Sequence, residues 1–241
     1  MRGMQRCAGS SLLRRLSATG ALRGYALKLA LRFEGGPFYS QTARWILARH
    51  YGVVIGDYSY GECFVPGAFA SGVKVGRYVS VGPGVRVFLR NHPMNRLSTH
   101  PFFYNHSLGF VDEDNIESGA LEIGHDAWIG AGAVILPGCS RIGVGAVVGA
   151  SAVVTKDLGD FGVAAGNPAR VIRSRFAPET CRLILASRWW ERSVSECVAH
   201  LTEMSGQLDD VFLRDRLLSA LRHVDGPGRG IRGATEEALR R

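Results

Sequence analysis

The sequence predicts a mainly β protein, a parallel β-helix that carries one long inserted loop and has helices at both ends. The first observation is a β-branched residue that recurs every six residues through the middle of the chain. The second is the spacing of the 31 glycines, most of which fall at regular intervals. The third is that no run approaches about 18 consecutive apolar residues, the length of a membrane-spanning helix. A soluble domain of stacked repeats fits these observations best.

The N-terminal segment, residues 1–49, is predicted to be helical and is strongly basic. Residues 1–50 hold nine Lys/Arg and one acid, Glu34, so they account for the whole net charge of +8 (9 − 1 = 8). An apolar set with helical spacing predicts an amphipathic helix packed on the body: Leu22, Tyr25, Ala26, Leu29 and Phe33. The alternative is that residues 1–33 contact an anionic membrane surface. Because the rest of the chain is neutral overall, no nucleic-acid partner is expected.

The six-residue repeat is clearest after residue 120. Its β-branched residues stand six apart with one step of seven: Ile123, Ile129, Ile135, Ile142, Val148 and Val154. A small residue follows most of them by four positions: Ala127, Ala133, Ala146 and Ala152. An earlier block repeats the pattern at Val75, Val81 and Val87. A β-helix domain is therefore expected over residues 50–176.

A period of six indicates a short strand followed by a corner. Three such units make one triangular coil, and coils stack through parallel-sheet hydrogen bonds about 4.8 Å apart. The β-branched residue fills the prism, the small residue avoids crowding, and glycine permits the backbone angles of the turn. The seven-residue step at Cys139, Ser140 and Arg141 predicts a bulge at one corner.

Two further segments depart from the repeat. Residues 88–120 form an insertion of a length that is usually functional, and it holds three of the seven histidines in an aromatic-rich stretch. Residues 177–224 have helical spacing after a helix-start signal at Pro178 and Glu179, and we expect these helices to cover the open end of the coil stack. Residues 225–241 are predicted to be a disordered tail.

The five cysteines are odd in number, scattered and without a C-x-x-C pair. Free or buried thiols in a reducing compartment are therefore expected, rather than disulfides or a zinc site.

Several motifs together resemble a known family, the hexapeptide-repeat acyltransferases, in their xenobiotic acetyltransferase branch. They are NHPMN at 91–95, STHPF at 98–102, WIG at 128–130, VTKD at 154–157, GNPA at 166–169 and WW at 189–190. The resemblance covers roughly residues 50–205 and leaves out the basic N-terminus and the tail. It implies left-handed coils, an exception to the usual crossover rule, and an acetyl-CoA-dependent acetyltransferase.

The resemblance places the catalytic histidine of this family at His92. An alcohol is a poor nucleophile at neutral pH, whereas an imidazole, with a reference pKa of about 6.5, can take its proton as the oxygen attacks a thioester. Direct transfer to the hydroxyl, without an acyl-enzyme, is the implied reaction. His100 and His106 are assigned to loop structure or acceptor contacts.

The resemblance also implies a groove for acetyl-CoA beside the coils, as co-substrate and with no metal. The residues that match it are Trp128, Gly130, Gly132, Gly149, Ala150, Thr155, Lys156, Asn167, Pro168 and Arg170. Lys156 and Arg170 are the expected phosphate contacts, with Arg173 and Arg175 as further candidates.

Acceptor contacts are predicted on the loop and on one nearby aromatic: Tyr58, Asn91, His100, Phe102 and Phe103. Aromatic side chains suit stacking on a sugar or contact with an apolar drug. A carbohydrate hydroxyl is the favoured acceptor, because the basic N-terminus would suit work near a membrane-borne glycan. An antibiotic of the chloramphenicol or streptogramin type is the alternative.

The family resemblance further implies a homotrimer with its sites at subunit interfaces. A cytoplasmic location is expected, with the inner membrane surface as the alternative. Two rival functions stay open: a zinc carbonic anhydrase on the same fold, for which no convincing ligand set is found, and a non-catalytic scaffold.

Overall fold

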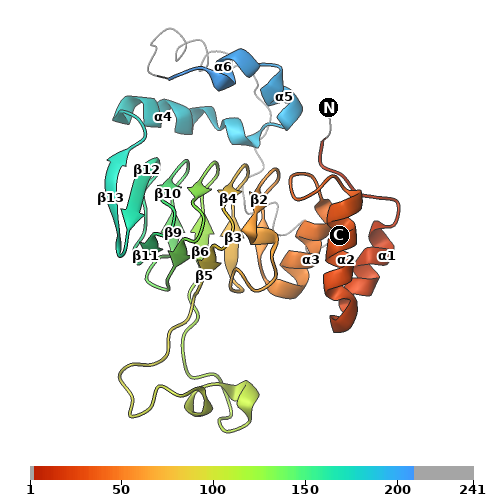
Figure 1. Cartoon of the computed structure of the whole chain (residues 1–241), viewed down its shortest axis with the longest axis vertical. Coiled ribbons are helices and arrows are strands. Elements are labelled where there is room, and N and C mark those ends of the chain that lie inside the picture. Colours follow the sequence, from red (N-terminus) through yellow and green to blue (C-terminus); the bar gives the residue numbers. More distant parts are fainter. Residues whose placement is uncertain (1–2, 209–241) are drawn as a thin grey trace.

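The computed structural model describes residues 3–208 of the chain, and Figure 1 shows a row of coils with helices at one end and along one side. Helices α1 (Ser10–Ala18), α2 (Gly20–Phe33) and α3 (Gln41–Tyr51) come first. The coils follow, and a long loop leaves them on the side opposite the C-terminal helices. The tail predicted at 225–241 and the helical spacing predicted at 211–221 lie outside the described residues.

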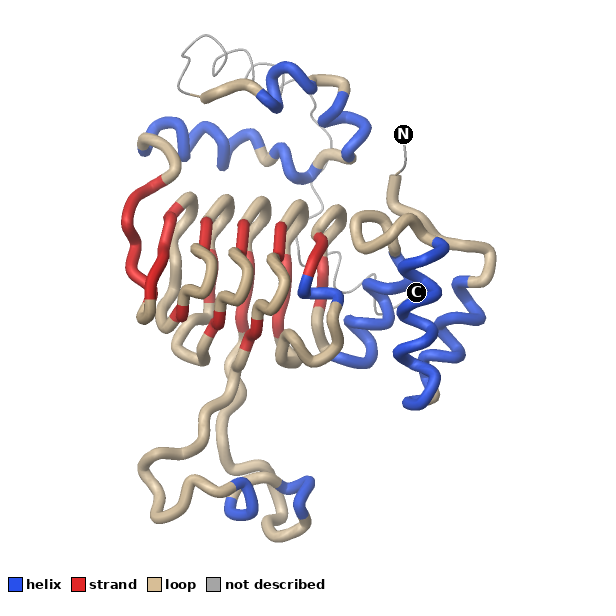
Figure 2. The backbone as a smooth tube through the Cα atoms, viewed as in Figure 1, coloured by secondary structure: helices blue, strands red, loops and turns tan. Residues whose placement is uncertain are grey.

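The coils form three parallel sheets, which the chain visits in rotation (Figure 2). The first sheet contains β1 (Val54–Ile55), β3 (Val73–Val75), β6 (Leu121–Ile123) and β9 (Arg141–Ile142). The second contains β2 (Tyr60–Gly61), β4 (Ser80–Val81), β7 (Trp128–Ile129), β10 (Val147–Val148) and β12 (Gly162–Gly166). The third contains β5 (Arg86–Val87), β8 (Val134–Ile135) and β11 (Val153–Val154). The arrangement is a three-sided parallel β-helix.

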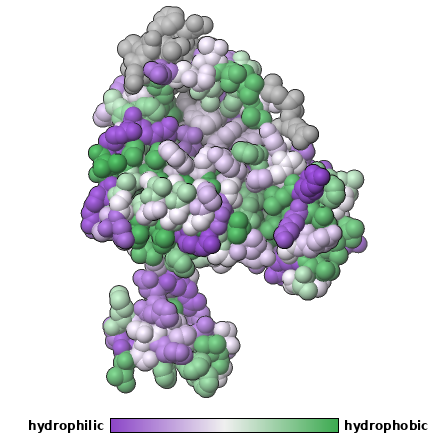
Figure 3. Space-filling view, in the orientation of Figure 1, coloured by the Kyte–Doolittle hydropathy of each residue, from purple (hydrophilic) through white to green (hydrophobic). Residues whose placement is uncertain are grey.

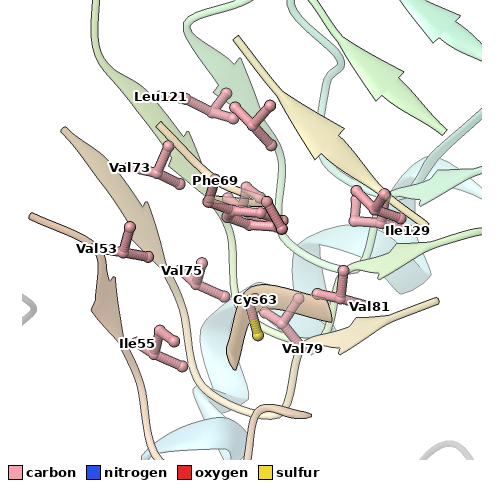
Figure 4. Packing of buried hydrophobic residues seen from close by; sticks show 14 of the residues in the cluster. Val53, Ile55, Cys63, Phe69, Val73, Val75, Val79, Val81, Leu121 and Ile129 are labelled. Atoms are coloured by element: carbon pink, nitrogen blue, oxygen red, sulfur yellow. The ribbon is translucent and has the colours of Figure 1, made fainter. Parts of the chain in front are cut away.

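The repeat residues fill the inside of this prism, as the six-residue period predicts. Ile123, Ile129, Ile135, Ile142 and Val148 have no exposed surface, and Val154 has 3%. Equivalent residues stack in register, for example Val75 on Ile123 and Ile123 on Ile142. Figure 4 shows valine, isoleucine and Phe69 side chains meeting between the sheets. Burial of these side chains supplies the main stabilising free energy of the fold.

The predicted corner bulge is present at the seven-residue step. β8 ends at Ile135 and β9 begins at Arg141, and Cys139 between them is fully buried. The carboxylate of Asp157, on the next coil, accepts hydrogen bonds from the backbone N–H of Ser140 (2.6 Å) and of Arg141 (3.0 Å). The extra residue is thus held by a side chain from the neighbouring coil.

The N-terminal helices cap the first coil, but α2 packs there with only one edge of the predicted face. Its buried residues are Ala26, Leu27 and Ala30, and they belong to the same core as the coils. Of the predicted set, Ala26 is buried and Leu29 is half-buried, whereas Leu22, Tyr25 and Phe33 are exposed. The small alanines let the helix approach closely, so the larger residues of the set face outward.

The C-terminal helices lie along the coils rather than over their open end, which corrects the sequence prediction. α4 (Pro178–Ser187) and the short 3-10 helix η4 (Trp189–Glu191) run along the corner between the first and second sheets (Figure 1). Trp190 stacks on His125 with ring centroids 5.4 Å apart. The Tyr78 hydroxyl donates to the Arg192 carbonyl at 2.7 Å. Two short helices, α5 (Val194–Val198) and α6 (Leu201–Ser205), follow.

The chain leaves the coils through a hairpin. β12 pairs antiparallel with β13 (Ala169–Ser174), which becomes the outer strand of the second sheet. Arg175 then ties this exit to the corner, because its guanidinium donates to the Gly145 carbonyl at 2.8 Å and lies 3.2 Å from the Asp126 carboxylate.

Two other findings concern the cysteines and the length of the helices. Within residues 3–208 all five cysteines are free thiols, and Cys63, Cys139 and Cys197 are buried. Among the helices of that same part of the chain, none has the length and apolar character that crossing a membrane requires.

Candidate active site

The inserted loop, residues 88–120, projects from the coils as an arm (Figures 1 and 2). The segments that enter and leave the arm are hydrogen-bonded at its base, where the Gly119 N–H donates to the Leu89 carbonyl at 2.9 Å. Further out, Arg90 pairs with Asp114 at 2.8 Å, and Asp114 also accepts from the backbone N–H of His106 at 2.9 Å. These hydrogen bonds, with the Arg90 pair, hold the pKa of Asp114 below its usual value. Asp114 therefore joins the two sides of the arm.

His92 lies on the arm with an exposed side chain. Its Nδ1 atom is 2.7 Å from the carbonyl oxygen of Thr99 and 2.8 Å from the hydroxyl of Tyr104. The Tyr104 ring meets the imidazole edge-on, with centroids 5.8 Å apart. The imidazole is thus held from one side by two oxygens.

This geometry selects one tautomer of the neutral imidazole. A carbonyl oxygen can only accept, so Nδ1 must carry the proton that bonds to Thr99. The Nε2 atom is then left with its lone pair, which is the arrangement that a general base needs. When Nε2 takes up a proton, the Nδ1–H bond to the Thr99 carbonyl becomes charge-assisted and stronger.

Tyr104 is the part of this site that the sequence analysis did not assign. It is 6% exposed, whereas most of the arm around it is open to solvent. Its backbone carbonyl accepts from the N–H of Asn115 at 3.0 Å, which fixes it between the two sides of the arm. In the sequence, Tyr104 is marked only by its place in the aromatic stretch, twelve residues after His92. The fold of the arm is what brings the two side chains together.

The predicted acceptor residues of the arm surround His92 in sequence and are exposed. Asn91 precedes it directly, and Phe102 and Phe103 are 44% and 58% exposed on the 3-10 helix η2 (Pro101–Phe103). His100 caps that helix, since its Nδ1 accepts from the Phe102 N–H at 3.3 Å. The His100 ring also packs on Phe102 with centroids 4.3 Å apart. His100 therefore has a structural role in presenting these aromatics.

Tyr58, the fifth predicted acceptor residue, is not brought to the arm. It is 7% exposed at the corner between the first and second sheets, where its ring packs on Tyr78 at 4.8 Å. The arm leaves from the corner between the third and first sheets, after β5 and before β6. Burial and a different corner therefore separate Tyr58 from His92 within one chain.

The small residues predicted to line a coenzyme groove lie together at the corner between the second and third sheets. Gly130, Gly132, Gly149 and Ala150 follow β7 and β10 there. A Cβ atom on Gly130 would lie 2.5 Å from the backbone nitrogen of Ala150, so glycine is required there by coil stacking. Gly56, at another corner, is equally tight. The close stacking of successive coils is therefore enough to explain glycine at positions such as 56 and 130. Gly132 and Ala150 are exposed at the surface of this corner.

Thr155 and Lys156 lie at the next corner, between the third and first sheets. They follow β11, and Lys156 is exposed while Thr155 is half-buried. This is the same corner from which the arm emerges two coils earlier. Lys156 therefore stands on the arm's side of the prism with its ammonium group open to a ligand.

The remaining predicted contacts are on the exit hairpin. Asn167 and Pro168, joined by a cis peptide bond, form its exposed turn. Arg170 and Arg173 are exposed and bond to nearby backbone carbonyls. Arg175 is engaged with Asp126 and the Gly145 carbonyl, so it serves structure rather than a phosphate.

Trp128 faces outward from β7 and is 57% exposed. It stands in register between Ser80 and Val147, and Val163 continues the row on β12. The third sheet also presents half-buried valines, Val134 and Val153, on its outer face. Trp128 therefore belongs to a partly apolar outer surface, next to the corner of exposed small residues.

Among residues 3–208, no cluster of three or more His, Cys, Asp and Glu side chains that could hold a metal ion is found. His125, which could have been a ligand, has its Nδ1 occupied by the Arg77 backbone N–H at 2.9 Å.

The sequence is similar to that of several acetyltransferases. It is 34% identical over 157 residues to a chloramphenicol acetyltransferase of Agrobacterium fabrum, covering 57% of this chain and 75% of the relative. It is 30% identical over 139 residues to a probable macrolide acetyltransferase of Lysinibacillus sphaericus, covering 55% and 77%. Three further chloramphenicol acetyltransferases are matched over only 58–62% of their length.

Solved structures give a looser likeness. A maltose O-acetyltransferase from Clostridium difficile 630 has a TM-score of 0.40 and 21% identity, over 70% of this chain and 85% of that one. No protein-family model matches the sequence.

Proposed function

The chain belongs to the xenobiotic acetyltransferase branch of the hexapeptide-repeat acyltransferases, and we propose that it transfers the acetyl group of acetyl-CoA to a hydroxyl, with His92 as general base. The observation that carries this proposal is the His92 imidazole, whose Nδ1 atom is committed to Thr99 and whose Nε2 atom has no hydrogen-bond partner among residues 3–208. In the proposed step the acceptor oxygen attacks the thioester carbonyl, a C–O bond forms and the C–S bond breaks. Nε2 takes the hydroxyl proton and passes it to the departing thiolate.

The proposed coenzyme site uses the coils beside the arm. Lys156 is an exposed cation on the arm's side of the prism, and Arg170 is exposed on the exit hairpin. Both suit phosphate groups. The exposed small residues Gly132 and Ala150 leave room for an extended ligand along the neighbouring corner.

We further propose that each site is completed by a second copy of the chain, within a left-handed trimer as in this family. The support is physical: the hydrogen bonds of His92 within residues 3–208 stay inside the arm. The arm also exposes large apolar side chains, including Met94 at 86% and Phe110 at 70%. The outer face of the second sheet carries the apolar side chains of Trp128, Val147 and Val163. If the arm packed on this face of a neighbouring copy, its exposed apolar side chains would be buried and His92 would reach the coenzyme of that neighbour.

The proposed acceptor is a carbohydrate hydroxyl, for which Phe102 and Phe103 offer exposed aromatic faces on the arm that carries His92. A hydroxyl-bearing antibiotic is the second candidate, and the names of the sequence relatives favour it.

The test is release of coenzyme A from acetyl-CoA, followed with a thiol reagent across a panel of sugars, chloramphenicol and a macrolide. The His92→Ala variant retains all five cysteines, so it also supplies the thiol background. His106→Ala is the matched control, because it removes another exposed histidine of the same arm. Acceptor-dependent release should fall about a thousandfold or more in His92→Ala and stay near wild type in the control.

Two results would overturn parts of this proposal. Unchanged release in His92→Ala would remove His92 from the mechanism. No release with any acceptor, together with no acetyl-CoA binding by calorimetry, would favour the scaffold function. Lys156→Ala should raise the Michaelis constant for acetyl-CoA about tenfold; a change confined to the acceptor constant would place the phosphates elsewhere.

A further inference from the structure

Helix α2 leaves an apolar stripe uncovered on the cap of the β-helix. The stripe is defined as Leu22, Tyr25, Leu29 and Phe33, which lie on one side of the helix at spacings of three and four. Leu22, Tyr25 and Phe33 are 42%, 61% and 64% exposed. The adjoining residues Ala26 and Ala30 are fully buried against the core. Leu29 is half-buried and packs against the core, whereas the side chains of Leu22, Tyr25 and Phe33 are left largely open to solvent.

The charges around the stripe have a single sign. Lys28 and Arg32 are exposed on the same helix, three and seven residues after Tyr25. Further exposed cations of residues 3–50 are Arg6, Arg15 and Arg49. Hydrophobic and strongly hydrophilic residues lie side by side over these helices in Figure 3. A partner must accept apolar and cationic groups on one surface.

The one acid of this region is withdrawn from that surface. Glu34 has no exposed surface, and its carboxylate accepts hydrogen bonds from Thr42 Oγ1 (2.6 Å), Ser40 Oγ (2.8 Å) and the Cys7 N–H (2.9 Å). Burial alone would raise its pKa, but the hydrogen bonds, led by Thr42, hold the pKa below its ordinary value. Its charge is thus satisfied internally at the N-terminus of α3.

We propose that this face of α2 docks on an anionic lipid bilayer, lying in the interface with the stripe toward the acyl chains. The helix has 14 residues, about 21 Å by its rise per residue, which suits a surface orientation. Lys28 and Arg32 flank the stripe at the height of the headgroups, where each basic residue strengthens binding to anionic lipid.

The charge pattern favours lipid over a second copy of the chain. A symmetric contact between two such faces would oppose exposed cations with no exposed acid of residues 3–50 to pair with them. An anionic bilayer provides both an apolar interior and negative headgroups. The inference is independent of the acetyltransferase proposal, because it uses none of the proposed site residues.

The test uses the full chain in co-sedimentation with two kinds of vesicle, pure phosphatidylcholine and phosphatidylcholine with about one third phosphatidylglycerol. Wild type should bind the anionic vesicles and release at high salt. Lys28→Gln and Arg32→Gln should each weaken binding about fivefold. The double variant Tyr25→Ser/Phe33→Ser should weaken it about tenfold or more without changing the charge.

The matched control is Val171→Ser/Ile172→Ser, which removes two equally exposed apolar residues, 63% and 66%, from β13 at the other end of the coils. It should bind as wild type does. Equal binding to both vesicles, no binding, or a loss in this control as large as in the stripe variant would overturn the proposal. The proposal would also be overturned if Tyr25→Ser/Phe33→Ser changed the oligomeric state in the absence of lipid, because this face of α2 would then be a contact between copies of the chain.

Discussion

The coils and the arm are built in opposite ways. In the coils, each inward side chain meets its equivalent from the next coil, and the repeat residues from Val75 to Val154 are at most 4% exposed. In the arm, residues 88–120, only Leu89 and Tyr104 are buried among the described side chains. The arm is held by hydrogen bonds and one ion pair rather than by a core. The coils thus contain most of the buried apolar core, and the arm exposes most of its side chains to solvent.

The difference assigns separate tasks to the two regions. A periodic core tolerates little change, because a lost methyl group leaves a cavity. An exposed arm carries little folding free energy, so its side chains can be chosen for chemistry. His92 lies on the arm, whereas the cations proposed for the phosphates, Lys156 and Arg170, lie on the coils and the exit hairpin.

The largest expected effect is on stability. Ile129→Ala should lower the free energy of unfolding by about 2–5 kcal/mol, because Ile129 is fully buried and its removal leaves a cavity. Leu97→Ala, a similar truncation on the arm, should change it by less than about 0.5 kcal/mol, because Leu97 is fully exposed. Denaturant unfolding measures both. Equal losses would mean that the arm contributes to the core after all.

A substitution at Tyr104 tests the contact between its buried side chain and the Nδ1 atom of His92. Tyr104→Phe keeps the ring packing but removes the hydroxyl 2.8 Å from His92 Nδ1. The turnover number should fall about tenfold, the worth of one hydrogen bond to a group that becomes charged, with the Michaelis constant for acetyl-CoA unchanged. Steady-state kinetics and thermal unfolding check this. A fall in melting temperature with unchanged turnover would give Tyr104 only a structural role.

The smallest expected effect is a pH dependence of folding stability that comes from His125, on the coils. Burial, and then the nearby Arg77 and Arg188, lower the pKa of His125 to about 4. The unfolded chain therefore binds a proton in the range from about pH 6.5 down to about pH 4, where the folded chain does not. The stability that the neutral His125 gives to the Trp190 corner is present above this range and is lost as the pH falls through it.

The variant His125→Asn isolates this contribution. An asparagine oxygen can still accept from the Arg77 N–H, but it does not titrate. The variant should lose less stability than wild type between pH 7 and pH 5, as followed by thermal unfolding and Trp fluorescence. Identical pH dependence in the two proteins would show that other groups control this corner.

The period of six was sufficient to predict the coils, because each β-branched residue has one possible direction in a prism. Ile123 and its equivalents are buried as expected, and the extra residue near Cys139 is accommodated at a corner. The exact orientation of α2 was not predictable, since the small side chains of Ala26 and Ala30 allow the closer approach. Hydrophobicity alone favours burial of Leu22, Tyr25 and Phe33, which are exposed.

The site was predictable in its residues but not in its arrangement. The motif around His92 placed the histidine on a loop, yet the contacts of its Nδ1 atom with the Thr99 carbonyl and the Tyr104 hydroxyl depend on how that loop folds. Tyr58 was a reasonable aromatic candidate by composition, but coil geometry buries it at a different corner. Likewise the glycine at position 130 reads as a ligand contact in sequence, although coil stacking already requires it.

The most direct test of the account is complementation between two inactive variants. His92→Ala removes the base from the arm, and Ala150→Trp fills the exposed corner of the coils proposed for acetyl-CoA. The two chains are co-expressed, purified together through different tags, and assayed for coenzyme A release. If the arm of one copy serves the coils of another, each mixed trimer selected by the two tags has one restored site among its three, so about one third of the sites regain activity. Activity no higher than that of the two variants assayed separately would contradict a shared site.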